Sequence, residues 1–361
     1  MSSLKIRALE SKPLQIPLER PIASALGTYT HVDCVLTFLR TEDGLTGCGF
    51  TMGLGGSAGS AIHPYIENEL APLAAGQDAL APEALWQRLW GPNKARMRGG
   101  LGLYALSAVD IACWDLVAKA AGLPLHRILG GFRTDVPVYG SGGWHTLTDA
   151  ELVEDCQAFA RRGIRAYKFK IGTARDEERV SLLRGEMGED FLLFVDANQK
   201  YNVRESVEVS AMLADHGIAW FEEPVLADTV DDLAEVAEKS AVPVAAGENA
   251  YMRWGFREIC ERRAADYLQP DVCRCGGVTE FQKVAHLADA FRISLTSHLV
   301  HEISVSLIGA TPSGYMAEYM ELFPEGTLTR DFTAEGGCVR VPEAAGHGME
   351  FTEDAIRRFA V

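Results

Sequence analysis

The sequence predicts an α/β protein whose larger part is a TIM-type (β/α)₈ barrel. Between about residues 135 and 320, short apolar strand patterns alternate with longer amphipathic stretches, as in repeated βα units. Polar residues follow these strands at a nearly regular interval. An open doubly wound sheet is the alternative, but no G-x-G-x-x-G follows the first strand. The length of 361 residues allows one large domain and a smaller one.

The region before the barrel is expected to contain strands and then helices. Ile6–Leu9 and Val35–Leu39 are strand-like, and Glu42–Gly44 is a turn signal. A helical zone follows from about residue 60. Its last helix, Leu103–Ala120, has apolar residues at helical spacing and ends before Gly122.

The barrel pattern contains strands that are short, apolar and separated mostly by helix-length segments. After about residue 325 we expect turns, a short strand at Val339–Val341 and a terminal helix near Glu353–Phe359. The expected barrel strands are Val136–Tyr139, Ala166–Ile171, Phe191–Val195, Ala219–Phe221, Val242–Ala246, Tyr267–Leu268, Ile293–Thr296 and Tyr315–Tyr319.

Composition argues against several classes of partner. There are 34 basic and 50 acidic residues, for a formal charge of −16, and such a chain does not attract nucleic acid or anionic membranes. No run of about 18 apolar residues suggests a membrane span, and the N-terminus lacks the apolar segment of a signal peptide. Eight scattered cysteines suit a reducing compartment. We therefore expect a soluble cytoplasmic protein.

The polar residues at the strand ends predict one ring of ionisable groups at the mouth of the barrel. From Lys170 on, consecutive members are 20 to 27 residues apart, which is about one βα unit. Barrel enzymes carry their active sites at the C-terminal ends of the strands. The members of this ring are Lys168, Lys170, Asp196, Glu222, Glu248, Asp271, His298 and Glu318.

Three acids in the ring predict a Mg²⁺ site. Asp196, Glu222 and Glu248 come from consecutive strands, and three carboxylates brought together stay ionised only around a cation. Oxygen ligands with room for water and substrate suit Mg²⁺. Each acid alone could be a solvated turn residue, but three at a constant interval favour the metal. We choose Glu222 as the ligand rather than Glu223.

Two lysines in the ring predict a base. Lys168 and Lys170 are two residues apart on one strand, so both project to the same face. Their mutual repulsion is expected to lower the pKa of each, which would make a neutral lysine accessible near neutral pH. An edge strand with one polar face is the alternative for an isolated pair, but barrels have no edges.

A histidine and two acids complete the ring. Asp271 on the preceding strand end can orient His298 and raise its basicity. His301 competes with His298 but has no obvious acidic partner. A protonated Glu318 could donate a hydrogen bond to a substrate carboxylate. Together these groups predict acid–base chemistry on a carboxylate bound near the metal.

The pattern resembles the enolase superfamily, mandelate racemase subgroup, over nearly the whole chain. No single motif is specific, but the set together is. The similar segments are Lys168-Phe169-Lys170, Asp196-Ala197-Asn198, Glu222-Glu223-Pro224, Gly247-Glu248-Asn249, Asp271 with Gly276-Gly277, Ser297-His298-Leu299, Glu302-Ile303-Ser304, Ala310-Thr311-Pro312, Leu129-Gly130-Gly131 and the helix Ala105–Ala118.

The resemblance implies a (β/α)₇β barrel over residues 126–325. An α+β capping domain would comprise residues 1–125 and the returning segment 326–361. It also implies a homo-oligomer, from dimer to octamer, and one Mg²⁺ per subunit. Two presumed lid loops, Arg20–His31 and Gly53–Gly59, match no known substrate signature.

The resemblance also implies residue roles. Asp196, Glu222 and Glu248 would hold Mg²⁺. Lys170 would be the base on one face of the substrate, and His298 with Asp271 the acid or base on the other. Lys168 and Glu318, with Mg²⁺, would bind the small carboxylate substrate, and Ser141 and Asn198 match positions that touch it.

The reaction that these groups imply is open between three outcomes. Dehydration of an acid sugar to a 2-keto acid is the hypothesis, because it is the commonest activity in relatives with this set of groups. Racemisation or epimerisation of a 2-hydroxy acid is second, and lactone cycloisomerisation third. A non-catalytic barrel would usually have lost one of these groups, and a zinc hydrolase would need more histidines.

Overall fold

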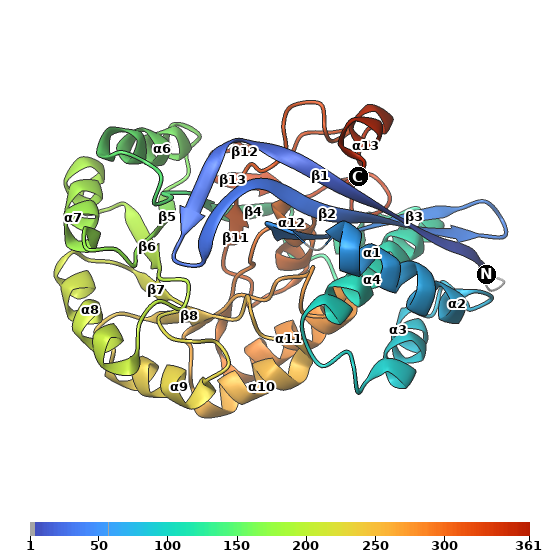
Figure 1. Ribbon diagram of the computed structural model, residues 1–361, viewed down its shortest axis with the longest axis horizontal. Coiled ribbons are helices and arrows are strands. Elements are labelled where there is room, and N and C mark those ends of the chain that lie inside the picture. Colours follow the sequence, from blue (N-terminus) through green and yellow to red (C-terminus); the bar gives the residue numbers. More distant parts are fainter. Residues whose placement is uncertain (1–3, 57) are drawn as a thin grey trace.

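The fold is a (β/α)₇β barrel with an α+β cap, as the sequence predicts. The computed structural model describes residues 4–56 and 58–361. Figure 1 shows the barrel on one side and the cap on the other, with the long β1–β2 hairpin reaching from the cap across to the barrel. The strands β1 (Ile6–Ser24), β2 (Gly27–Thr41) and β3 (Thr46–Leu54) form an antiparallel sheet in that order.

The expectation of a loop at Arg20–His31 is wrong, because this segment is the end of the β1–β2 hairpin and is mostly strand. Ile22 pairs with Tyr29 and Ser24 pairs with Gly27, after a register shift near Pro17. The backbone carbonyl of Ala23 accepts a hydrogen bond from the His145 N–H of the barrel at 2.9 Å. The second presumed loop begins within β3 and continues into a helical segment at Ala58, and its Ser57 lies outside the described residues.

The helices of the cap pack on one face of this sheet. Short helical segments between residues 58 and 74 and α3 (Pro82–Trp90) precede α4 (Leu101–Ala121). By length and composition, α4 could span a membrane, but 72% of its most apolar stretch is buried inside the protein. Gly122 ends the helix in the left-handed conformation, as the sequence predicts.

The barrel contains parallel strands that alternate with helices. In the part of the chain that the structure describes, eight strands pair in the order β10-β9-β8-β7-β6-β5-β4-β11, and a bridge from Leu295 to Gly314 joins the two ends. In chain order the elements are β4 (Asp135–Ser141), α6 (Asp149–Arg161), β5 (Ala166–Lys170), α7 (Asp176–Met187), β6 (Leu192–Asp196), α8 (Val203–Asp215), β7 (Trp220–Glu222), α9 (Val230–Lys239), β8 (Val244–Ala246), α10 (Met252–Arg262), β9 (Tyr267–Leu268), α11 (Gly277–Phe291), β10 (Ser294–Leu295), α12 (His301–Ala310) and β11 (Ala317–Tyr319).

An aromatic layer fills the barrel below the polar ring. The rings of Phe194 and Trp220 stack with centroids 3.6 Å apart, and Tyr139 meets both edge-on. Phe194 and Trp220 stand two residues before Asp196 and Glu222, so each strand directs its aromatic residue and its acid to the same inner face. The polar side chains therefore lie directly above a packed apolar plug.

The C-terminal segment contacts both parts of the molecule. The strands β12 (Ala334–Glu335) and β13 (Cys338–Arg340) extend the sheet at β4. The helix α13 (Glu353–Phe359) has the bounds that the sequence predicts, and Ala360 then bridges to Leu14 of β1. The chain thus ends on the cap sheet.

Candidate active site

The structure brings the predicted ring together at the C-terminal ends of the barrel strands. Strand register sets neighbours side by side, since Lys170 pairs with Asp196 and Asp196 pairs with Glu222. The predicted members are all buried, with Glu248 and His298 among the most accessible at 5% and 6% exposed.

The three predicted metal ligands fit a divalent cation. Oxygen atoms of Asp196, Glu222 and Glu248 lie within 4.8 Å of one another. Glu248 Oε2 is buried and accepts no hydrogen bond. Mg²⁺ prefers hard oxygen ligands and usually keeps some coordination positions for water and substrate. Three carboxylates, one of them with an oxygen that accepts no hydrogen bond, fit this preference.

The two lysines pair with these acids. Lys168 Nζ lies 2.5 Å from Glu222 Oε1 and 2.8 Å from Glu318 Oε1. Burial alone would lower the pKa of Lys168, but the Glu222 and Glu318 carboxylates outweigh it and raise that pKa well above its usual value. The expectation that repulsion from the second lysine lowers this pKa is therefore wrong for Lys168, because its acidic neighbours are closer.

Lys170 occupies the more open position of the two. Its Nζ lies 2.5 Å from Asp196 Oδ2 and 5.1 Å from the centre of the Trp144 ring. Unlike Lys168, it lines the cavity at the barrel mouth. Lys170 can therefore reach a bound molecule, while Lys168 lies deeper, among the acids.

The cluster holds more negative charge than the lysines neutralise. Burial, opposed by Lys168 and reinforced by Asp196, raises the pKa of Glu222 to about 8, although Glu222 is paired with Lys168. In Glu223, burial and the charge of Glu248 raise the pKa well above its usual value, and the Asn249 amide donates to both of its oxygens at 2.9 Å. A surplus of buried carboxylates is the environment that a bound divalent cation compensates.

The predicted histidine and acid form a dyad. His298 Nδ1 lies 2.8 Å from Asp271 Oδ2, and His298 Nε2 lies 3.2 Å from Glu248 Oε2. His298 also lines the cavity, on the far side of the metal-ligand strands from Lys170. Asp271 therefore holds the imidazole so that Nε2 faces the cavity.

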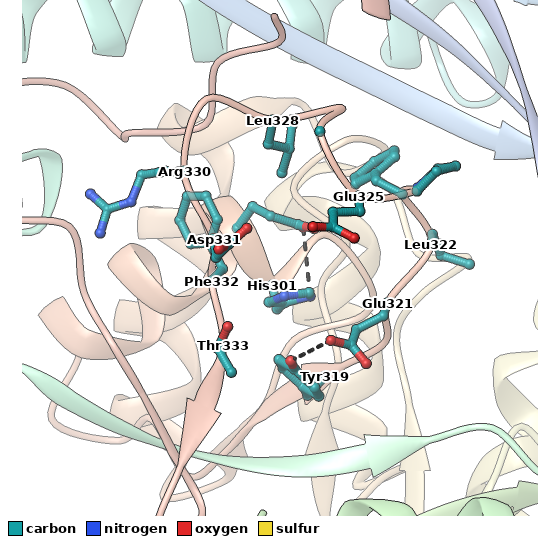
Figure 2. Close-up of a pocket in the computed structure, with 14 residues that line it drawn as sticks. His301, Tyr319, Glu321, Leu322, Glu325, Leu328, Arg330, Asp331, Phe332 and Thr333 are labelled. Carbon is teal, nitrogen blue, oxygen red and sulfur yellow. Dashed lines mark hydrogen bonds and ion pairs between the residues drawn. The ribbon is translucent and has the colours of Figure 1, made fainter.

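The competing histidine lies elsewhere. His301 begins α12 and lines a different pocket, between this helix and residues 319–333, which shares no described lining residue with the barrel-mouth cavity. Figure 2 shows His301 with Tyr319 and Phe332 in that pocket, and the His301 and Tyr319 ring centres are 4.5 Å apart. Burial lowers the pKa of His301 to about 3, so it stays neutral at physiological pH.

Glu318 differs from its expected state. Burial alone would raise its pKa, but the charge of Lys168 and a hydrogen bond from the Leu299 N–H at 2.6 Å hold the pKa of Glu318 well below its usual value. The expectation of a protonated Glu318 is wrong here, because the lysine that it faces favours the carboxylate.

The two predicted substrate contacts fall in different places. Asn198 lines the cavity, and its side-chain amide donates to Asp196 Oδ2 at 3.1 Å. Ser141 ends β4 and is buried with its hydroxyl unpaired, but it lines a neighbouring groove beside Trp144 and not the cavity itself.

Sequence reasoning missed several residues of the site. Arg274 Nη1 lies 3.2 Å from Glu248 Oε1 and its Nε lies 3.1 Å from Asp271 Oδ2, so it joins a predicted metal ligand to the dyad. Gln269 donates to Glu222 Oε2 at 2.7 Å. Gln269 stands two residues before Asp271, and this spacing could have indicated that both side chains project to the same face. Arg274 follows in a turn with no periodicity.

A second acidic group outside the barrel is already neutralised. Asp115 and Glu350 lie near Cys48, but Lys119 Nζ is 2.8 Å from Asp115 and 2.6 Å from Glu350. Burial raises the pKa of the Cys48 thiol to about 11. These ion pairs therefore link α4 to the C-terminal segment.

Family models match both parts of the chain. The description "Mandelate racemase / muconate lactonizing enzyme, N-terminal domain" matches residues 9–130, and "Enolase C-terminal domain-like" matches residues 151–355. The chain belongs to the mandelate racemase and muconate lactonizing enzyme family. The family's two-part division is the cap and barrel described above.

Its relatives are enzymes of several kinds. The chain is 34% identical to 3,6-anhydro-alpha-L-galactonate cycloisomerase of Streptomyces coelicolor, over 94% of this chain and 96% of that one. It is 35% identical to arabinonate dehydratase of Saccharolobus solfataricus, over 94% of each. A solved Streptomyces coelicolor racemase with bound magnesium superposes with a TM-score of 0.95 at 32% identity, covering 99% of this chain and 100% of that one.

Proposed function

We propose that the protein removes the proton next to a carboxylate in a Mg²⁺-dependent reaction and thereby dehydrates an acid sugar to a 2-keto-3-deoxy acid. The single observation that carries this proposal is the placement of Lys170 and His298. Both line one cavity, from strands on either side of those that carry Asp196, Glu222 and Glu248. A substrate carbon between them is within reach of two groups that transfer protons.

The residues divide the work of the reaction. Mg²⁺, held by Asp196, Glu222 and Glu248, would supply positive charge to the substrate carboxylate as electrons move onto it. The Lys168 ammonium, which lies deeper among the acids, adds a fixed positive charge below the same group. Lys170 takes the proton from the carbon next to the carboxylate.

The dyad completes the dehydration. Protonated His298 gives its Nε2 proton to the hydroxyl on the following carbon, which leaves as water. The enol that remains rearranges to the 2-keto acid, so the product is the substrate less one water. Asp271 orients the imidazole for that transfer.

Two alternatives use the same groups. If His298 returns a proton to the carbon that Lys170 deprotonates, the result is racemisation or epimerisation, and the solved racemase with bound magnesium supports this second candidate. If the leaving group is an oxygen that stays attached elsewhere in the same substrate, the result is cycloisomerisation. The similarity to 3,6-anhydro-alpha-L-galactonate cycloisomerase supports this third candidate.

A substrate screen tests the proposal. The purified protein with Mg²⁺ is incubated with a library of monoacid and diacid sugars, and 2-keto acid is measured with and without EDTA. We expect keto acid from at least one sugar and none with EDTA. Loss of optical rotation from a mandelate enantiomer without keto acid would instead support the racemase. Hydrolysis that requires Zn²⁺ would contradict the proposal.

A further inference from the structure

The cavity above the ring has a second wall, which the cap supplies. Its volume is about 280 Å³. The barrel contributes Lys170, His298 and Arg274, while the β1–β2 hairpin, β3, the segment after it and α4 close the other side. A substrate whose carboxylate lies at the ring must direct its far end toward this cap wall.

The cap wall carries a carboxylate with spare hydrogen-bonding capacity. Asp33 of β2 is 6% exposed and lines the cavity. Its Oδ1 accepts from Gln15 Nε2 at 3.3 Å, and its Oδ2 accepts no hydrogen bond. The nearest basic group in the described structure, His31 Nε2, lies 3.3 Å from Oδ2 without forming a hydrogen bond. A buried carboxylate oxygen without a donor is costly, so a ligand that donates a hydrogen bond there gains affinity.

Apart from His31, no basic side chain among the described residues pairs with that carboxylate. Among the described lining residues, the lysine and arginine side chains are Lys170 and Arg274, and both belong to the barrel. Lys170 pairs with Asp196, and Arg274 pairs with Glu248 and Asp271. The remaining cap wall is uncharged and consists of aliphatic residues, glycines, Ser24 and the tyrosines Tyr29 and Tyr104. The cavity can therefore bind a negatively charged group of a ligand at its barrel end only.

We infer that the substrate is a monocarboxylate of the aldonate type, with a neutral far end whose hydroxyl donates to Asp33, and that diacids are rejected. The inference rests on the proposed function for the placement of the first carboxylate. A second carboxylate would lie against Asp33, which is only 6% exposed. Like charges in such a place repel strongly, and specificity arises from that repulsion as much as from attraction.

A binding measurement tests the inference apart from turnover. The Lys170→Ala variant, loaded with Mg²⁺, is titrated by calorimetry with aldonates and aldarates matched in length and configuration. We expect each aldarate to bind at least about tenfold more weakly than its aldonate, because a like-charge contact costs at least that much. Adding Asp33→Asn should bring the two Kd values within about threefold of each other, because the amide keeps the shape but not the charge.

A matched variant controls for net charge. Glu10→Gln also removes one negative charge, but Glu10 lies on β1, away from the cavity, and pairs with Arg40 at 3.2 Å. The aldarate-to-aldonate Kd ratio should not change in this variant. If Asp33→Asn does not fold, the ratio in the protein with Asp33 intact decides the question.

Several results would overturn the inference. One is an aldarate that binds as tightly as its matched aldonate or more tightly, and another is a Kd ratio that Asp33→Asn leaves unchanged. Tighter binding of an acid with an ammonium group at its far end, or no binding of either sugar class, would also overturn it. Keto acid formed from aldarates as efficiently as from aldonates would overturn it while supporting the proposed function. The two proposals can therefore fail separately.

Discussion

At the residue scale, the two lysines of β5 show what a spacing can and cannot reveal. That both project to one face follows from the period of a strand, and the structure places them so. The pKa of Lys168 does not follow from that spacing, because it depends on Glu222 and Glu318, which are 54 and 150 residues away along the chain. Charged partners from distant strands decide the electrostatics, and the sequence does not give their distances.

Arg274 leads to a prediction about positioning. Because it contacts both Glu248 and Asp271, Arg274→Met should lower kcat by about 10- to 100-fold and weaken Mg²⁺ binding, with a smaller change in KM. Steady-state kinetics and a Mg²⁺ titration measure both effects. Arg274→Lys keeps the charge but not the two contacts, so its kcat should lie between those of the unaltered protein and Arg274→Met. Unchanged kcat in Arg274→Met would show that the contact is incidental.

At the element scale, the presence of each barrel strand was easier to predict than its bounds. Each expected barrel strand is present, but Val242–Ala246 shortens to Val244–Ala246 and Ile293–Thr296 to Ser294–Leu295. Apolar patterning marks burial, which extends beyond the paired residues. The hairpin end at Arg20–His31 was missed as strand, because its polar residues show no alternation that distinguishes it from a loop.

The contact between β3 and α4 leads to a prediction about stability. A Cβ on Gly49 would lie 1.9 Å from the Ala108 carbonyl oxygen, so Gly49→Ala must push the helix from the sheet. We expect a loss of at least about 2 kcal/mol in unfolding free energy, as for other overpacked cores. Denaturant unfolding measures this loss.

Gly185 provides the control for that prediction. It lies on the exposed face of α7 with no atom within 4 Å of an added Cβ. Gly185→Ala should stabilise the protein by about 0.5 to 1 kcal/mol through helix propensity. If Gly49→Ala were equally harmless, the close approach of β3 and α4 would not be a determinant of stability.

At the scale of the whole molecule, the sequence predicted which residues gather at the barrel mouth better than which residues enclose them. The ring could be predicted because one βα period repeats through the barrel. The cap wall, with Asp33 and Tyr104, comes from strands and helices that share no period with the barrel. Which of their residues face the cavity depends on how the cap docks, and no local pattern encodes that.

The surplus of acids predicts a response to metal. Mg²⁺ that binds only the folded state should raise the melting temperature, and the rise should grow with its concentration. Glu248→Gln should abolish most of this shift without lowering the melting temperature in EDTA, because Asp196 and Glu222 retain their lysine partners. Differential scanning calorimetry measures both values. A full Mg²⁺ shift in Glu248→Gln would contradict the assignment of this ligand.

In the proposed reaction, Lys170 and His298 act on one substrate from two sides of the cavity. Exchange of the hydrogen next to the carboxylate, followed by NMR in ²H₂O with Mg²⁺, tests it most directly. We predict that His298→Asn forms no product but still exchanges this hydrogen in an acid of the configuration that faces Lys170. Lys170→Ala, folded and able to bind Mg²⁺, should show neither product nor that exchange. Full turnover by Lys170→Ala would contradict the account.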